Sequence, residues 1–246
     1  MLLPSMISHK QFVIAVCVTM LLSFLYGVIT VQYKIPPYDL LRGIKQLLGS
    51  GSGSSPMPSR SDYFYEKKSF FEQHGGHQYD VLFIGDSITD AAEWEDLFPS
   101  LKIANRGISG DTTDGVLERL DSVYSTHAKK AFIMVGVNDF GGGAELNAVF
   151  DNYKSIINSL TAHGMQTYVQ STILAGRQRT GLNEKITALN ALLEKMADQT
   201  KAFTYIDLNA GLARGSFLES QYSRDGIHLN GSGYAVWKDI IKTYIE

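Results

Sequence analysis

A serine, a histidine and an aspartate in this sequence have the types and spacing needed for nucleophilic catalysis. Ser87 lies in the segment GDSIT, and Asp225 precedes His228 by three residues in the segment DGIH. A serine hydroxyl is a poor nucleophile until a neighbouring base takes its proton, and histidine suits that role near neutral pH. A carboxylate can orient the imidazole and stabilise its protonated form. The three residues predict acyl transfer, with Ser87 as nucleophile, His228 as general base and Asp225 as its partner.

Acyl transfer also needs hydrogen-bond donors that face the oxyanion of the tetrahedral intermediate. The sequence offers the backbone N–H groups of Ser87 and Gly107 and the side-chain amide of Asn138. Glycine at position 107 allows the backbone to approach a ligand closely. Loss of one such donor typically lowers kcat by about 10²–10³. Asp86 and Asp139 adjoin Ser87 and Asn138, and we interpret them as residues that orient these loops rather than act on the substrate.

Short apolar runs alternate with amphipathic stretches, and these elements must position the reactive residues. Continuous apolar runs of this length are typical of parallel strands that are buried on both faces. Strands that alternate with helices predict a three-layer α/β/α sandwich with a five-stranded parallel sheet. Ligands bind at the carboxyl ends of such strands, so the reactive segments are expected to meet at one sheet edge. The predicted strands are Val81–Ile84, Leu101–Ala104, Ala131–Val135, Thr167–Gln170 and Phe203–Ile206.

Four segments, GDSIT, NRGISGD, GVND and DGIHLN, together resemble the sequence blocks of the SGNH hydrolases, also called the GDSL esterase/lipase family. The resemblance extends over roughly residues 79–244. It implies a flavodoxin-like sheet and chemistry without a metal or organic cofactor. The stretch NRGISGDTTDGVLERL is similar to bacterial members that act on small acyl esters and to the platelet-activating-factor acetylhydrolase branch. The same roles follow from the resemblance for Ser87, Gly107, Asn138, Asp225 and His228.

Two further segments are candidates for substrate contact. Phe140 precedes three consecutive glycines, which predicts a segment able to move over the site and a substrate contact for Phe140. Arg177 and Arg179 follow the fourth predicted strand. They fit an acidic or phosphorylated substrate, and they equally fit a loop whose charges face solvent.

The amino-terminal part of the chain predicts a membrane anchor. Residues 11–33 contain no charged side chain, and a bilayer core of roughly 30 Å needs about 20 helical residues. A cleaved signal peptide has a shorter apolar region and a small-residue cleavage site, so we favour an uncleaved anchor. We therefore divide the 246 residues into a flank (1–10), a transmembrane signal-anchor helix (11–33), a juxtamembrane segment with a Gly/Ser-rich linker (34–60) and a hydrolase domain (61–246).

The orientation of this predicted single-pass anchor has two opposing indicators. Lys10 precedes the span, whereas Lys34, Arg42 and Lys45 follow it, which favours a cytoplasmic domain by the positive-inside rule. A flexible tether beside a membrane instead suits work on an extracellular polymer. We expect the domain to lie outside the cytoplasm.

Composition excludes several other classes of protein. A net charge of −3 and an isoelectric point near 6.1 argue against nucleic-acid binding, which normally uses a basic patch. The single cysteine, Cys17, excludes an internal disulfide and a cysteine-based zinc site. The sequence does not indicate an oligomeric state.

These observations favour a membrane-anchored serine esterase that acts on small acyl esters, chiefly acetyl esters, on cell-envelope or extracellular carbohydrate. An O-acyltransferase, a lysophospholipase and a thioesterase are alternatives with the same site. A non-catalytic envelope-binding module is a further alternative, which the intact set of reactive residues disfavours.

Overall fold

The computed structural model describes residues 10, 18–20, 23, 26 and 60–245, apart from the side chain of residue 180. The chain divides into two units, 1–59 and Arg60–Glu246. The predicted anchor at 11–33 and the segment 34–60 lie almost wholly outside the described residues. Among the residues that are described, no helix combines the length and apolar character needed to cross a bilayer.

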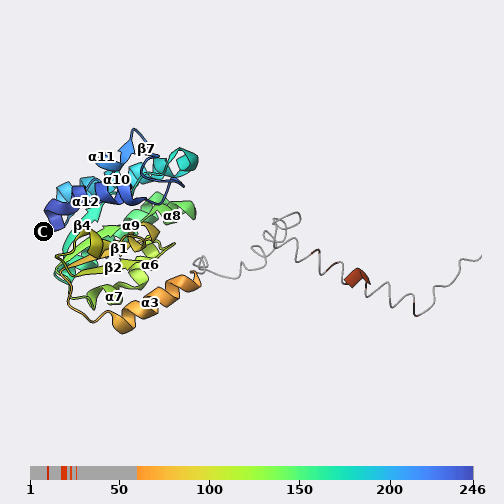
Figure 1. Ribbon diagram of the computed structural model, residues 1–246, viewed down its shortest axis with the longest axis horizontal. Coiled ribbons are helices and arrows are strands. Elements are labelled where there is room, and N and C mark those ends of the chain that lie inside the picture. Colours follow the sequence, from red (N-terminus) through yellow and green to blue (C-terminus); the bar gives the residue numbers. More distant parts are fainter. Residues whose placement is uncertain (1–9, 11–17, 21–22, 24–25, 27–59, 246) are drawn as a thin grey trace, which may run out of the picture. The chain divides into compact units, whose positions relative to one another are not determined.

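Five parallel strands form the centre of the unit Arg60–Glu246, in the order β2-β1-β3-β4-β5 (Figure 1). All five residues of β1 are buried, as expected for a strand covered on both faces. The predicted five-stranded parallel sheet is therefore confirmed. The strands are β1 (Val81–Gly85), β2 (Ile103–Gly107), β3 (Lys130–Met134), β4 (Gln166–Gln170) and β5 (Thr204–Ile206).

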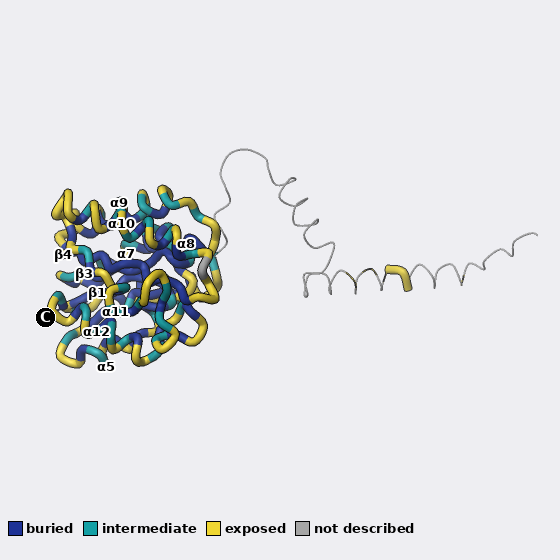
Figure 2. The backbone as a smooth tube through the Cα atoms, turned by 90° about the horizontal axis from the view of Figure 1, so that it is seen from above, coloured by how far each residue is buried: buried dark blue, intermediate teal, exposed yellow. Residues whose placement is uncertain are grey.

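Helices cover both faces of this sheet, with α9 (Leu146–Ala162) and α10 (Asn183–Thr200) on one side and α12 (Gly231–Ile245) on the other (Figure 2). The apolar stripe of α9 recurs at helical spacing and is buried. The shorter elements of the unit are α4 (Ser87–Asp90), α5 (Trp94–Leu97), α8 (Val137–Gly141), the 3₁₀ helix η1 (Arg177–Leu182), α11 (Asn209–Leu212), β6 (Ala213–Arg214) and β7 (Phe217–Leu218). The predicted three-layer sandwich is confirmed.

The first helix of the unit is α3 (Asp62–His74). Ser61 caps it by accepting a hydrogen bond from the N–H of Phe64. Just before this helix, Arg60 forms ion pairs with Asp114 and Glu118 at 2.9 and 2.8 Å. These contacts tie the start of the folded unit to α6 (Thr113–Glu118).

The second strand was predicted two residues too early. The polar residues Asn105 and Arg106 suggested a loop, but both lie inside β2. Asn105 donates hydrogen bonds to the carbonyls of Asp90 and Ala92, at 3.1 and 3.3 Å. Arg106 is 6% exposed, and its guanidinium lies 4.6 Å from the ring centroid of Phe71 in α3. Polar side chains with partners inside the fold concealed this strand.

The apolar residues from Val116 to Tyr124 belong to two helices, α6 and α7 (Leu120–Tyr124). The helical conformation breaks at Arg119, where φ is −121° and ψ is 20°. The Arg119 side chain is fully buried beneath the sheet edge. The break directs this guanidinium inward, where it contributes to the site described next.

Candidate active site

Ser87 lies at the carboxyl end of β1, where the strand turns directly into α4. Gly85 must be glycine, because a Cβ there would lie 2.2 Å from Thr89 Oγ1 and 2.4 Å from the carbonyl oxygen of Met134. Asp86 caps α4 by accepting the N–H of Ile88. Tyr234 on α12 holds the same helix by donating its hydroxyl to the Ile88 carbonyl at 2.8 Å. The turn therefore presents the half-buried Ser87 from a fixed backbone.

The structure brings the three predicted catalytic side chains into one hydrogen-bonded row. Ser87 Oγ lies 2.9 Å from His228 Nε2, and His228 Nδ1 lies 2.6 Å from Asp225 Oδ2. The first distance allows Nε2 to accept the serine proton. The second fixes the ring orientation and places a carboxylate beside the nitrogen that carries the other proton. Ser87 and Asp225 come from opposite ends of the domain sequence, so only the fold brings them together.

Asp225 is held in its ionised form. Burial alone would raise its pKa, but the hydrogen bonds from the His228 ring and from the N–H groups of Ile227 and His228 outweigh this effect. The pKa of Asp225 therefore lies well below its usual range. The carboxylate stays charged across the neutral range and can stabilise a protonated His228.

A tight turn places Asp225 and His228 on the same side of their loop. Gly226, at φ 79°, adopts a left-handed conformation that favours glycine. Ser223 Oγ accepts the N–H of Gly226 at 2.9 Å and donates to Asp225 Oδ1 at 3.2 Å. Serine is common in loops, so no sequence pattern indicated this role of Ser223.

The three predicted oxyanion donors differ in their surroundings. As the first residue of α4, Ser87 has a backbone N–H with no acceptor inside its helix. Asn138, on α8, uses one amide hydrogen to bond the Asp111 carbonyl at 2.9 Å, which leaves the second. The N–H of Gly107 donates to Asn105 Oδ1 at 2.9 Å, and Gly107 is itself buried.

Position 107 requires glycine because of a backbone contact that the sequence did not indicate. A Cβ there would lie 2.2 Å from the backbone nitrogen of Asp90 and 2.7 Å from the carbonyl carbon of Thr89. The close approach seen here is between β2 and the backbone of α4. Gly107 allows the strand to pack directly against the helix that carries Ser87.

Asp86 and Asp139 each accept a hydrogen bond from a backbone N–H group, and both are buried. Asp86 Oδ1 accepts the Ile88 N–H at 3.0 Å, whereas Oδ2 has no partner among the described residues. Burial, with added repulsion from Asp111 and Asp139, raises the pKa of Asp86 to about 7. Burial also raises the pKa of Asp139 to about 6, although Asp139 accepts hydrogen bonds from the backbone and hydroxyl of Thr113.

A buried ion pair that the sequence analysis missed connects these elements. Arg119 Nη2 lies 2.8 Å from Asp111 Oδ2, and both side chains are fully buried. The same nitrogen donates to the Gly85 carbonyl at 3.2 Å. Asp111 in turn accepts the Asn138 amide through its own carbonyl. The pair therefore joins the end of β1 to Asn138, but no sequence pattern distinguishes these two charges from solvated ones.

The predicted substrate contact by Phe140 is wrong. Phe140 is 5% exposed and packs in the hydrophobic core. Residues 137–141 form α8, so Phe140 lies within a helix rather than in a glycine-hinged loop. Within the described part of the chain, no group of three or more His, Cys, Asp or Glu side chains is placed to hold a metal ion.

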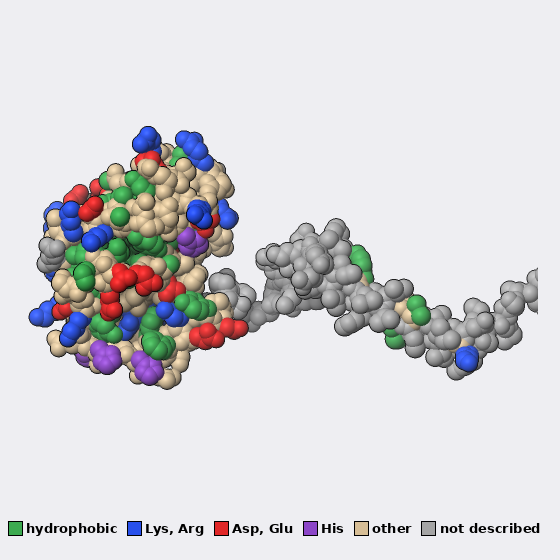
Figure 3. Space-filling view, in the orientation of Figure 1, with side chains coloured by type: hydrophobic (Ala, Val, Ile, Leu, Met, Phe, Trp, Pro, Cys, Tyr) green, Lys and Arg blue, Asp and Glu red, His purple; other side chains and the backbone are tan. Residues whose placement is uncertain are grey.

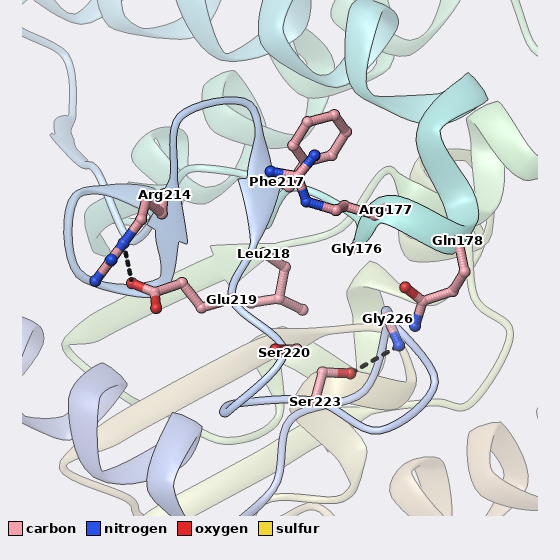
Figure 4. A pocket seen from close by; sticks show the side chains of 10 residues that line it. All are labelled: Gly176, Arg177, Gln178, Arg214, Phe217, Leu218, Glu219, Ser220, Ser223 and Gly226. Carbon is pink, nitrogen blue, oxygen red and sulfur yellow. Dashed lines mark hydrogen bonds and ion pairs between the residues drawn. The ribbon is translucent and has the colours of Figure 1, made fainter.

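Arg177, but not Arg179, lines a cavity of about 380 Å³ beside the Asp225 turn. Figure 4 shows side chains from three segments around this cavity, which include Arg177, Gln178, Arg214, Phe217, Glu219 and Ser223. Arg179 is exposed. On the face shown in Figure 3, Lys and Arg side chains are interspersed with Asp and Glu and form no continuous basic stripe.

Comparison with known proteins identifies the family. The profile of the GDSL-like lipase/acylhydrolase family matches residues 83–236, which include Ser87, Gly107, Asn138, Asp225 and His228. The chain belongs to this family. The resemblance drawn from the four sequence blocks is thereby confirmed. The acylhydrolase is an enzyme of the ester-hydrolysing serine hydrolase type.

Individual relatives of this acylhydrolase point in the same direction. It is 29% identical over 165 residues to the platelet-activating factor acetylhydrolase IB subunit alpha2 of Gallus gallus. The matched region covers 63% of this chain and 71% of the relative. A Streptococcus pneumonia protein provisionally described as a platelet activating factor is 26% identical, with a TM-score of 0.70 over 75% of this chain and 93% of the other. A GDSL-like lipase from Bacteroides thetaiotaomicron is 25% identical, with a TM-score of 0.63 over 74% and 98% of the two chains.

Proposed function

We propose that this acylhydrolase is a membrane-anchored esterase that removes small acyl groups, chiefly acetyl groups, from ester oxygens. The proposal rests on one observation above all, the row of contacts from Ser87 Oγ through His228 to Asp225 at 2.9 and 2.6 Å. The preference for acetyl is supported by the relatives named acetylhydrolases. We assign the acetylated oxygen to carbohydrate of the cell envelope or the extracellular space.

In the first half of the reaction, Ser87 Oγ attacks the ester carbonyl carbon while His228 Nε2 takes the hydroxyl proton. The carbonyl oxygen becomes an oxyanion that faces the Ser87 N–H and the free amide hydrogen of Asn138. Gly107 is the third donor, with its N–H shared between this oxyanion and Asn105 Oδ1, an arrangement known for three-centre hydrogen bonds. Asp225 stabilises the protonated imidazole while the oxyanion is present.

The tetrahedral intermediate then collapses, and the bond between the carbonyl carbon and the alcohol oxygen breaks. His228 transfers its proton to the leaving alcohol, which departs and leaves the acyl group on Ser87. Water enters, gives a proton to His228 and attacks the acyl carbon. Collapse of the second intermediate returns the proton to Ser87 Oγ and releases the carboxylic acid.

The chemical proposal is tested with p-nitrophenyl esters from acetate to long acyl chains, with Ser87→Ala as control. We expect activity to be highest with acetate and absent in the variant. An optimum at long chains would favour a lysophospholipase or thioesterase. A folded protein with no activity on any of these esters would contradict the esterase and favour an acyltransferase or a binding module.

The location is a separate part of the proposal. The uncharged residues 11–33 are assigned as the anchor, with the acylhydrolase domain outside the cytoplasm. A tag at the carboxyl terminus should then be cleaved by protease added to intact cells. Full protection of the tag, with cleavage only after lysis, would show that the domain lies inside.

A further inference from the structure

The cavity beside the Asp225 turn has walls that are fixed in place. Its walls are the start of η1 at Gly176–Gln178, the hairpin of β6 and β7, and the turn at residues 223–226. The buried Asn183 joins the first two walls (5% exposed). Its amide donates to the carbonyls of Ala175 and Ser216, at 2.8 and 2.7 Å, and its Oδ1 accepts the Ala175 N–H at 2.7 Å. The cavity is thus built into the fold.

The third wall belongs to the loop that carries the catalytic pair. Gly226 lines the cavity and lies between Asp225 and His228 in the sequence. The Gly176 N–H donates to the Gly226 carbonyl at 2.8 Å, so the first wall is bonded directly to the catalytic loop. In acyl transfer the histidine gives its proton to the leaving alcohol. A cavity on the histidine loop is therefore placed for the alcohol part of the ester.

The charges around the cavity favour an anion. The guanidinium of Arg177 lies 4.6 Å from the ring centroid of Phe217, which orients it over the cavity wall (Figure 4). No acidic side chain in the described part of the chain pairs with Arg177. Arg214, in contrast, pairs with Glu219 at 3.5 Å. Among the side chains that line the cavity, two arginines and one glutamate leave one positive charge, while the Asp225 carboxylate in the adjoining turn is bonded to His228. The planar guanidinium suits carboxylate and phosphate geometry.

We propose that this cavity binds an anionic group, a carboxylate or a phosphate, on the alcohol part of the substrate ester, with Arg177 as its main contact. The assignment to the alcohol part rests on the proposed esterase function. The cavity would make the enzyme selective for acidic acyl-ester substrates over neutral ones. Arg177 is a specificity residue here and takes no part in bond breaking.

The test compares two pairs of acetyl esters, and the two members of each pair differ in one charge. The 3- and 4-acetoxybenzoates carry a carboxylate on the leaving phenol, and their methyl esters do not. Full-length protein in a non-ionic detergent is assayed as wild type, Arg177→Gln, and Arg179→Gln as the matched control from the same segment. The intrinsic reactivities of the esters cancel, because the ratio of kcat/KM for charged and neutral ester is compared between variants.

We expect Arg177→Gln to lower kcat/KM for at least one charged ester about fivefold, because exposed charge pairs contribute modestly. The neutral esters should change less than twofold, and Arg179→Gln should change neither class. An equal effect of Arg177→Gln on both classes, or no effect on either, would overturn the proposal for the cavity. Hydrolysis of the methyl esters that is lost in Ser87→Ala supports the esterase whatever the charged esters show.

A binding measurement separates the cavity from catalysis. Calorimetric titration with phenyl phosphate and with benzoate reports anion binding without turnover, and their comparison distinguishes phosphate from carboxylate. Binding of either anion that is lost in Arg177→Gln and kept in Arg179→Gln supports the cavity even in a protein that hydrolyses no ester. Absence of binding of both anions to the wild type would overturn the proposal.

Discussion

Asp86, the residue before the nucleophile, makes stability depend on pH in a direction opposite to that of most carboxylates. It is fully buried, and its pKa is raised from 3.8 to about 7 because burial disfavours the charged form. The folded protein therefore holds a proton on Asp86 that the unfolded chain has already released between about pH 4 and pH 7. The stabilisation is complete below the unfolded pKa and is lost as the pH rises through the folded pKa.

The magnitude follows from these two pKa values. One pKa unit corresponds to about 1.4 kcal/mol, so the free energy of unfolding should fall by about 3 kcal/mol between pH 5 and pH 8 through this group alone. Asp86→Asn keeps an oxygen that can cap α4 and removes the ionisation. The free energy of unfolding of the variant, relative to wild type, should therefore rise by about 3 kcal/mol from pH 5 to pH 8.

Urea unfolding of both proteins at pH 5 and pH 8 measures this difference. Asp151→Asn is the control for loss of one carboxylate, because the Asp151 side chain is 65% exposed. A difference between Asp86→Asn and wild type that is the same at both pH values would refute the reasoning. It would mean that Asp86 has the same pKa in the folded and the unfolded protein, so that burial does not disfavour its charged form.

Three further predictions concern other contacts of the site. Asp225→Asn should lower kcat by about 10³–10⁴, since the imidazolium loses its carboxylate, and steady-state kinetics with p-nitrophenyl acetate measures this. Gly107→Ala should lower kcat by about 10² or more, because the new methyl group meets the α4 backbone; Gly141→Ala, which meets open space, should retain wild-type kinetics. Arg119→Met should lower the free energy of unfolding by about 3–5 kcal/mol, or the melting temperature by roughly 10 °C, because Asp111 is left charged and unpaired. Adding Asp111→Leu should recover most of that loss, and a double variant no more stable than the single one would contradict this explanation.

The reactive residues could be predicted from the sequence because their order along the chain reflects the sheet. The segments with Ser87, Gly107 and Asn138 follow or end β1, β2 and β3, and the segment with Asp225 and His228 comes after β5, the last strand of the sheet. Parallel strands bring their carboxyl ends to one edge. Ser87, Asp225 and His228 were therefore predictable although 141 residues separate Ser87 from its histidine. The apolar runs predicted four of the five strands, β1, β3, β4 and β5, to within one residue of the observed bounds at each end.

The errors concern polar residues that the fold buries. Asn105 and Arg106 suggested a loop, and no pattern marked Arg119 as buried, because the partners of these side chains lie in other segments. Phe140 suggested a mobile contact because the glycines after it were given more weight than its apolar side chain. A pattern of residue types reports which side chains favour water on average. It does not report which charges find a partner inside.

The tie made by Asn183 has a consequence for how such an enzyme can change in evolution. Asn183 bonds only main-chain atoms of Ala175 and Ser216, so it holds the hairpin whatever side chains the hairpin carries. Arg214 and Phe217 stand on that hairpin and belong to no strand of the main sheet. Mutations there can alter the cavity while the nucleophile, its histidine and the donors around them keep their positions. The architecture separates the catalytic residues from those that select the substrate, so new substrate preferences can arise from substitutions at a few residues of the hairpin.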